Sequence, residues 1–262
     1  MRAATPRKPA MTAPPEPASR APSGAARSLA VQVEQVLSWL RRTGSQAGRD
    51  GMARFAIPSD RAFGVPVGAL RQQARRLGIN HELAAGLWET GWYEARMLAV
   101  FVAEPARVTS AQMDRWCRDF DNWAIVDTAC FHLFDHTPHA WRKVALWAAR
   151  RGEFAKRAAF ALLWSLSVHD KDAGDAPFFA GLQLIEREAG DERHFVRKAI
   201  NMALRAVGKR NLALNAAAVS VARRLAGAPE SAPRWIGKDA LRELTSASVA
   251  QRLARKDRAR TR

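Results

Sequence analysis

One pattern occurs three times in the sequence, in YEARMLAVFV (93–102), FAKRAAFALL (154–163) and FVRKAINMAL (195–204). Each copy starts with an aromatic residue, has a basic residue three positions later, and continues with alanine and other apolar residues. The alignment places Arg96, Arg157 and Lys198 at equivalent positions, and the last two copies start 41 residues apart. Helical pairs that repeat about every 40 residues are typical of HEAT and armadillo solenoids. The pattern therefore predicts an all-α fold, an α-solenoid of HEAT-like repeats with a concave basic groove.

The rest of the chain from residue 29 onward also has helical patterns, and the alternating β-branched pattern of strands is missing. The expected helices are 31–42, 66–78, 81–90, 93–104, 114–120, 123–134, 139–151, 153–168, 175–189, 192–208 and 211–226. We expect breaks at 44–51 and 229–233, with two short helices, 237–245 and 246–256, after the second. A plain helical bundle stays open as an alternative because the repeats are weak.

Short polar residues mark several helix starts. Asn80 can cap one helix, and Thr109 with Gln112 forms a capping-box pattern for another. Either Asp121 or Asn122 can cap the helix that follows them, and Thr137 followed by proline suggests a cap with Pro at the first helical position.

The net charge of +17 is spread over the whole chain. We divide the chain into a Pro- and Arg-rich tail at 1–28, expected to be disordered, a HEAT-like-repeat domain at 29–245, and a basic C-terminal helix or tail at 246–262. The two ends carry +4 and +5, which leaves +8 in the body. A folded body with that excess suits a polyanion better than a small neutral substrate. A merely Arg- and Ala-rich composition would give the same charge, so charge alone favours nucleic acid without establishing it.

Other classes of protein fit the composition poorly. The two cysteines, Cys117 and Cys130, have no metal-like spacing and no signal peptide precedes them, which indicates a reducing cytosol. No apolar run approaches the ~20 residues that a membrane-spanning helix needs. We therefore expect a cytoplasmic protein, nucleoid-associated when on DNA, with no membrane contact.

A basic stripe is expected on the 192–208 helix, formed at helical spacing by Lys198, Met202, Arg205 and Lys209. Arg157 occupies an equivalent position in the preceding repeat. Basic positions on successive helices form a groove suited to a phosphate backbone, so these five residues are our candidate DNA-binding residues. A solvated charged face is the ordinary alternative.

The segment FDNWAIVD (120–127) raises a different question. Trp123 and Asp127 are four residues apart, so they share one helix face, and Asp127 stands among apolar residues. Burying a carboxylate there costs free energy unless the carboxylate is paired with a cation, caps a helix or takes part in function. The structural interpretation is that Asp127 pairs with an arginine or caps a neighbouring helix, and the functional interpretation is catalysis.

Five segments in this order resemble the AlkD-type DNA alkylation repair family, the HEAT-like-repeat alkylpurine DNA glycosylases. They are FGVPVGALR (63–71), LWETGWYEARMLA (87–99), FDNWAIVD (120–127), FAKRAAFALL (154–163) and FVRKAINMALRAVGKRN (195–211). The resemblance covers roughly residues 60–245. It implies excision of cationic alkylated purines, such as N3-methyladenine and N7-methylguanine, from duplex DNA without base flipping.

The resemblance also assigns roles. It implies that Asp127 is the essential carboxylate, that Trp123 packs on the lesion deoxyribose, and that Arg157 and Arg205 approach phosphates near the lesion. Two positions depart from the family pattern. Met202 replaces a tryptophan, so one wall of the aromatic cleft differs, and Ala124 replaces an acidic residue.

One carboxylate can suffice for such chemistry. Glycosidases commonly use two carboxyl groups because a neutral leaving group must be protonated. An alkylated purine already carries positive charge and leaves as a neutral base. What remains is to stabilise an oxocarbenium-like sugar and to position a water, and a carboxylate beside an aromatic face suits both tasks.

Two other functions stay open: a non-catalytic DNA-binding repeat protein that recognises distorted or branched DNA, and a protein-binding scaffold, for which the charge is poorly suited. We predict no metal and no cofactor. His132, His136 and His139 have a loosely metal-like spacing, but Pro138 interrupts it, so we interpret them as surface or capping histidines. The expected partner is double-stranded DNA with alkylated purines, bound by a monomer.

Overall fold

The computed structural model describes residues 24–260, and the expected N-terminal tail therefore lies largely outside the described residues. Within that range the chain is helical and contains no strand. The helices are α1 (Gly24–Thr43), α2 (Gln46–Ala53), α3 (Val67–Leu77), α4 (His81–Glu89), α5 (Tyr93–Val102), η1 (Pro105–Arg107), α6 (Ser110–Arg118), α7 (Trp123–His132), η2 (Phe134–His136), α8 (Ala140–Ala148), α9 (Glu153–His169), α10 (Ala176–Glu188), α11 (His194–Val207), α12 (Leu212–Ala226), α13 (Ser231–Leu244) and α14 (Ala247–Arg260).

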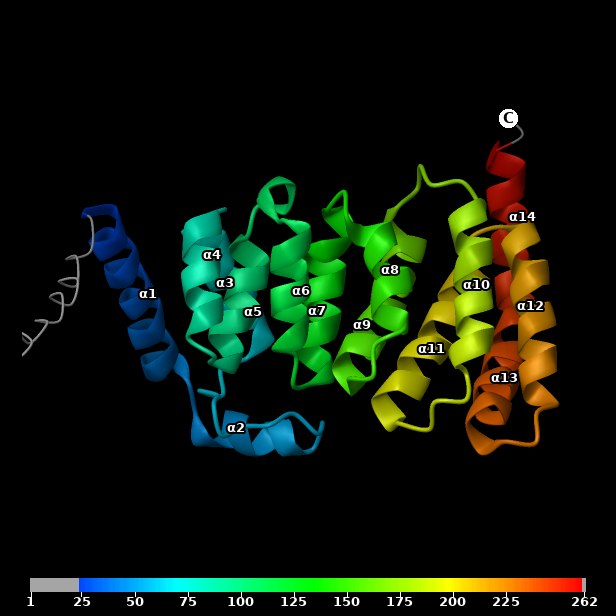
Figure 1. Cartoon of the computed structure of the whole chain (residues 1–262), viewed down its shortest axis with the longest axis horizontal. Coiled ribbons are helices and arrows are strands. Elements are labelled where there is room, and N and C mark those ends of the chain that lie inside the picture. Colours follow the sequence, from blue (N-terminus) through cyan, green and yellow to red (C-terminus); the bar gives the residue numbers. More distant parts are fainter. Residues whose placement is uncertain (1–23, 261–262) are drawn as a thin grey trace, which may run out of the picture.

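The helices stack side by side along the long axis of the molecule (Figure 1). One layer is formed by α5, α7, α9, α11 and α13, each of which packs on the next. The helices α4, α8 and α12 each pack on the following helix of that layer, and α10 contacts α8, α11 and α12. This is the arrangement of HEAT-like pairs, so the predicted α-solenoid is confirmed and the plain bundle is excluded.

Three of the expected caps are present. The side chains of Asn80, Thr109 and Asn122 accept hydrogen bonds from backbone N–H groups in the first turns of α4, α6 and α7. Of the two candidates for the last of these, Asn122 is the cap. These bonds satisfy donors that a helix start otherwise leaves unpaired.

Other local predictions were wrong. The expected break at 44–51 contains α2, which Ser45 caps. Thr137 does not cap α8, because its hydroxyl donates to the carbonyl of Phe134 and the helix starts at Ala140. The expected break at 229–233 ends early, because α13 begins at Ser231 and contains Pro233 in its first turn, where the missing N–H costs no helical hydrogen bond. α14 continues to Arg260.

Large aromatic side chains fill the space between the layers. The rings of Trp88 and Trp116 stack with centroids 4.0 Å apart, and both side chains are buried with Trp147 and Phe134. No helix in the described part of the chain is long and apolar enough to cross a membrane. The rigid stack fixes the positions of α7 and α9, which carry the candidate site.

Candidate functional site

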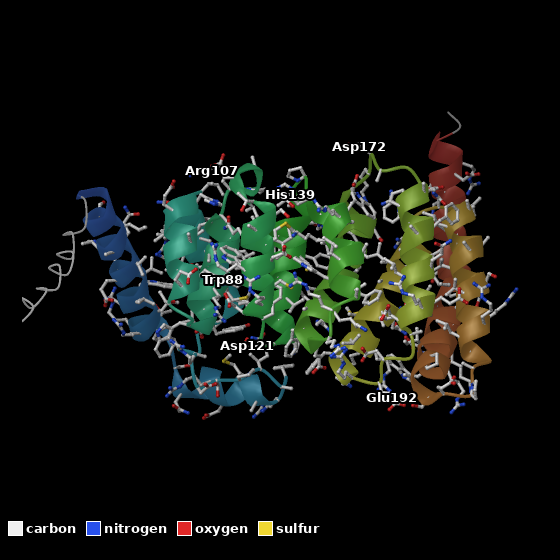
Figure 2. All side chains as sticks on the ribbon, in the orientation of Figure 1. Trp88, Arg107, Asp121, His139, Asp172 and Glu192 are labelled. Carbon is white, nitrogen blue, oxygen red and sulfur yellow. The ribbon has the colours of Figure 1, made fainter. Side chains whose placement is uncertain are left out.

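The site lies where α7 and α9 pack together in the middle of the stack. α7 begins near Asp121, which is labelled at the lower ends of the stacked helices in Figure 2, and runs toward the upper ends, where His139 is labelled. The Asn122 cap fixes this start, which places Trp123 on the first turn and Asp127 one turn further along. The sequence prediction that both share one helix face is consistent with these positions.

Asp127 is held by Arg157 from α9. The guanidinium donates from Nε to Oδ1 at 3.0 Å and from Nη2 to Oδ2 at 2.6 Å, a bidentate ion pair. Its Nη1 donates to the carbonyl of Phe195 on α11 at 2.8 Å. Arg157 thus ties three consecutive helices of one layer together. Only 4% of its side chain is exposed, against 18% for Asp127, so the carboxylate is the accessible member of the pair.

Burial and pairing act on Asp127 in opposite directions. Burial raises the pKa of its carboxyl group, because removal from water disfavours the charged form, and the Arg157 guanidinium opposes that rise. An arginine stays protonated throughout the physiological range, and a bidentate bond of this geometry needs a carboxylate as acceptor. The pair therefore remains ionised near neutral pH.

Trp123 completes the group. The Arg157 guanidinium carbon lies 5.9 Å from the centroid of the Trp123 ring, within range of a cation–π contact. The indole Nε1 donates to the carbonyl of Phe55 at 2.7 Å, in the segment that follows α2. Trp123, Asp127 and Arg157 therefore form one contiguous cluster, which we call the carboxylate cluster.

The segment that holds Trp123 leads into FGVPVGALR and is anchored by Glu94. This fully buried carboxylate accepts hydrogen bonds from the backbone N–H groups of Phe63, Gly64 and Val65 at 2.9, 2.6 and 3.1 Å. Gly64 adopts a φ of 79°, which side-chain-bearing residues rarely do. The start of the FGVPVGALR segment thus has a structural role, and Glu94 is a supporting residue that was not predicted from the sequence.

A hollow of about 700 Å³ opens between α7 and α9 beside the cluster. Asp127 lies in its wall, together with Phe131, Trp164, His169 and Lys171. The rings of Phe131 and Trp164 meet edge to face with centroids 4.4 Å apart. The hollow therefore offers an aromatic wall and an accessible carboxylate. Trp164 could not be recognised as a site residue from the sequence, because its position on α9 resembles an ordinary core position.

The expected basic stripe on α11 is divided between two environments. Lys198 is exposed. Arg205 instead pairs with Glu243 and lies 3.6 Å from Asp239, and the Lys209 ammonium lies 2.6 Å from Glu243. Met202 is half-buried. Acidic residues of α13 thus neutralise much of the stripe, which the sequence alone could not reveal.

The stacked helical pairs define an α-solenoid protein, and its acid–arginine–aromatic cluster faces an open hollow. The chain belongs to the family of DNA alkylation repair enzymes, whose family model matches residues 36–244. One solved structure matches this chain with a TM-score of 0.66 and 22% sequence identity. The match covers 73% of this chain and 82% of the chain in that structure. That structure is described as representing a new family of proteins related to the HEAT-like repeat DNA glycosylases with affinity for branched DNA structures. No curated protein matches the chain significantly.

Proposed function

We propose that this protein is a DNA glycosylase that excises cationic N-alkylated purines, such as N3-methyladenine and N7-methylguanine, from duplex DNA. The observation that carries the proposal is the carboxylate cluster: Asp127 is accessible from the hollow and oriented by Arg157, whose guanidinium also lies over the Trp123 ring. Membership of the DNA alkylation repair enzyme family supports the same reaction class. We further propose that the protein acts as a monomer in the cytoplasm.

Asp127 retains capacity for this chemistry although Arg157 bonds both of its oxygens. A carboxylate has about four lone-pair sites, and the guanidinium occupies two of them. The remaining sites can accept a hydrogen bond from water and face a developing positive charge on the sugar. The reaction needs no general acid, because a cationic purine leaves as a neutral base.

We propose for Arg157 a role other than the phosphate contact that the family resemblance implies. Its guanidinium is buried and its Nε, Nη1 and Nη2 atoms already donate to Asp127 and to Phe195. We propose that Arg157 is a positioning residue that fixes the carboxylate. Arg205 and Lys209 both donate hydrogen bonds to Glu243. Among the candidate DNA-binding residues, the exposed Lys198 is therefore best placed to contact a phosphate.

The test is base release from methylated duplex DNA, followed by chromatography, with wild type and Asp127→Asn compared at a temperature where both are folded. The substitution removes the charge and leaves Arg157 facing an amide. We expect base release to fall by about 100-fold or more, because a charge aimed at the transition state is lost. Wild-type protein that releases no more base than buffer overturns the proposal.

Asp114→Asn provides the matched control. Asp114 bonds the Lys143 ammonium at 2.7 Å and the Trp147 indole at 2.8 Å, away from the carboxylate cluster. This variant also removes the negative partner of a buried cation, Lys143, and should therefore lower stability. It should release base at the wild-type rate wherever it is folded, which separates loss of fold from loss of chemistry.

A non-catalytic protein that binds distorted or branched DNA is the second candidate. Two observations favour it: Met202 stands where the family resemblance implies a tryptophan, and Arg157 already bonds both oxygens of Asp127. The similar solved structure is described as having affinity for branched DNA. Mobility shifts with a four-way junction and with a duplex of equal length test this candidate. It requires tighter binding to the junction and no base release.

A further inference from the structure

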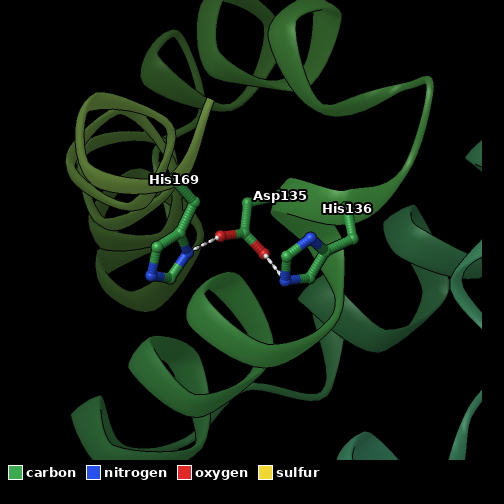
Figure 3. Close-up of side chains that lie close together, drawn as sticks. All are labelled: Asp135, His136 and His169. Carbon is green, nitrogen blue, oxygen red and sulfur yellow. Dashed lines mark hydrogen bonds and ion pairs between the residues drawn. The ribbon is translucent and has the colours of Figure 1, made fainter. Parts of the chain in front are cut away.

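Two histidines and one aspartate converge at the end of the hollow opposite the start of α7. Asp135 and His136 belong to η2, and His169 is the last residue of α9 (Figure 3). The Asp135 carboxylate lies between the two rings, with Oδ2 2.5 Å from Nδ1 of His169 and Oδ1 3.6 Å from Nε2 of His136. The three ligand atoms lie within 4.8 Å of one another. Residues 34 positions apart are thus brought together by the fold.

We propose that Asp135, His136 and His169 bind a divalent transition-metal ion of the zinc class. Imidazole nitrogens and a carboxylate oxygen are ligands that such ions accept, and three protein ligands are typical of sites with an open fourth position. Tetrahedral geometry with bonds of about 2.0–2.2 Å places ligand atoms roughly 3.3 Å apart. The Oδ2–Nδ1 separation of 2.5 Å and the Oδ1–Nε2 separation of 3.6 Å lie on either side of that value.

The unsatisfied carboxylate oxygen is the second observation that supports a metal ion. The Asp135 side chain is completely buried, and its Oδ1 accepts no hydrogen bond from any described residue. The separation of 3.6 Å from His136 is too long for a hydrogen bond. A buried carboxylate oxygen without a partner is costly, and a cation between Oδ1 and the imidazoles would satisfy it.

The surroundings leave room for such an ion. The His136 and His169 side chains are 53% and 38% exposed, and both line the hollow that Asp127 also lines. The two rings are nearly parallel, with centroids 5.8 Å apart. Lys171 is the nearby cation in the wall of this hollow, and its ammonium is bonded to the Val168 carbonyl. The ion would therefore be reachable from solvent and would present its fourth position to water or to a DNA phosphate.

Spacing along the sequence did not reveal this site. The three histidines at 132, 136 and 139 suggested only surface or capping residues, and neither His132 nor His139 belongs to the cluster. His132 instead contacts the Arg71 guanidinium at 3.3 Å. The proposed ligands come from two separate segments, because His169 is the last residue of α9, so local spacing could not indicate them.

Zinc binding to the untagged full-length protein tests the proposal independently of any activity on DNA. Titration against a competing chelating dye should give one Zn²⁺ per chain for the wild type. His136→Ala and His169→Ala should each weaken binding by at least about tenfold, judged from the losses that removal of supporting groups alone causes. The melting temperature of the wild type should rise with Zn²⁺, and that rise should shrink in both variants.

Two control variants remove a histidine outside the cluster. His194→Ala changes an exposed residue at the start of α11, and His132→Ala changes a residue in the wall of the same hollow. Both should bind Zn²⁺ like the wild type. The proposal is overturned if the wild type binds no Zn²⁺ at micromolar concentrations, or if the His136 and His169 variants bind as tightly as the controls. Asp135→Asn is unsuitable as the decisive variant because its side chain is buried and folding can fail.

Discussion

The ion pair between Asp127 and Arg157 has a structural role and, in our proposal, a chemical one. Each residue neutralises the other in a buried position, and the Phe195 carbonyl takes up a further donor of the arginine. Such a pair adds little net stability compared with apolar residues, but removing one partner is costly because the other charge stays buried. A carboxylate that is fixed before substrate binds loses little freedom on reaching the transition state.

The raised pKa of Asp127 predicts where activity is lost in acid. Burial raises this pKa, so as the pH falls the carboxylate is protonated at a higher pH than an ordinary aspartate, for which the pKa is about 3.9. Base release depends on the ionised form, so its rate should fall with decreasing pH from above that value. A pH–rate profile corrected for spontaneous depurination measures this. An acid limb centred at the ordinary value contradicts the assignment.

Arg157→Ala and Lys198→Ala should affect different properties: the first should lower stability, and the second should change the salt dependence of DNA binding. Arg157→Ala leaves the largely buried Asp127 carboxylate unpaired, so we expect a loss of up to about 3–5 kcal/mol of stability and little change in the salt dependence of DNA binding. Lys198→Ala should leave stability unchanged, because the side chain is exposed, and should flatten the slope of log K against log salt by roughly one unit. Chemical denaturation and binding titrations at several salt concentrations measure both effects. A flatter slope of log K against log salt in the Arg157 variant would instead indicate that Arg157 contacts a phosphate.

The segment between α2 and α3 depends on one side chain of α5. Glu94 binds three consecutive backbone N–H groups, and this fixes the chain that runs on from Phe55, the partner of the Trp123 indole. The helix α2 lies across the ends of the stacked helices in Figure 1. Support for the carboxylate cluster therefore reaches it from a segment about 70 residues earlier in the chain.

Glu94→Ala should be strongly destabilising. It leaves the N–H groups of Phe63, Gly64 and Val65 without their acceptor, and each unsatisfied buried donor costs about 1–3 kcal/mol. Glu94→Gln keeps one acceptor oxygen and should fall between the alanine variant and the wild type. Thermal unfolding ranks the three proteins. Equal stability of the alanine variant and the wild type would show that the segment does not need this anchor.

The repeat pattern predicted the helices well, because amphipathic spacing and caps act locally. It did not predict what each equivalent position does. Arg96 donates to the Asp119 carbonyl, Arg157 pairs with Asp127, and Lys198 is exposed. Which acid lies opposite a basic residue depends on how separate helices stack, so the neutralisation of Arg205 by Glu243 was outside the reach of the sequence. The pairing of Asp127 with an arginine was foreseen, but as an alternative to function rather than as part of it.

The positive charge of the protein is unevenly available to a polyanion. The acidic residues of α13 offset Arg205 on α11 and Lys209 just after it. By contrast, α14 carries exposed basic residues at the C-terminal end of the stack. A terminal helix of a solenoid must bury one face and keep the other polar. In α14, Val249 and Leu253 are buried, and Arg252 and Arg255 are exposed.

Different substitutions in α14 should therefore change the stability and the DNA affinity of the protein independently. Removal of residues 246–262 uncovers the surface under Val249 and Leu253, each worth about 1.5–3 kcal/mol when fully buried, so the melting temperature should fall. The double variant Arg252→Gln, Arg255→Gln keeps both apolar contacts and should melt like the wild type. If α14 faces DNA, this double variant should bind undamaged duplex more weakly and lose up to about two units of salt slope. An unchanged slope with an unchanged melting temperature would place α14 away from DNA and leave it only the role of covering the last helical pair.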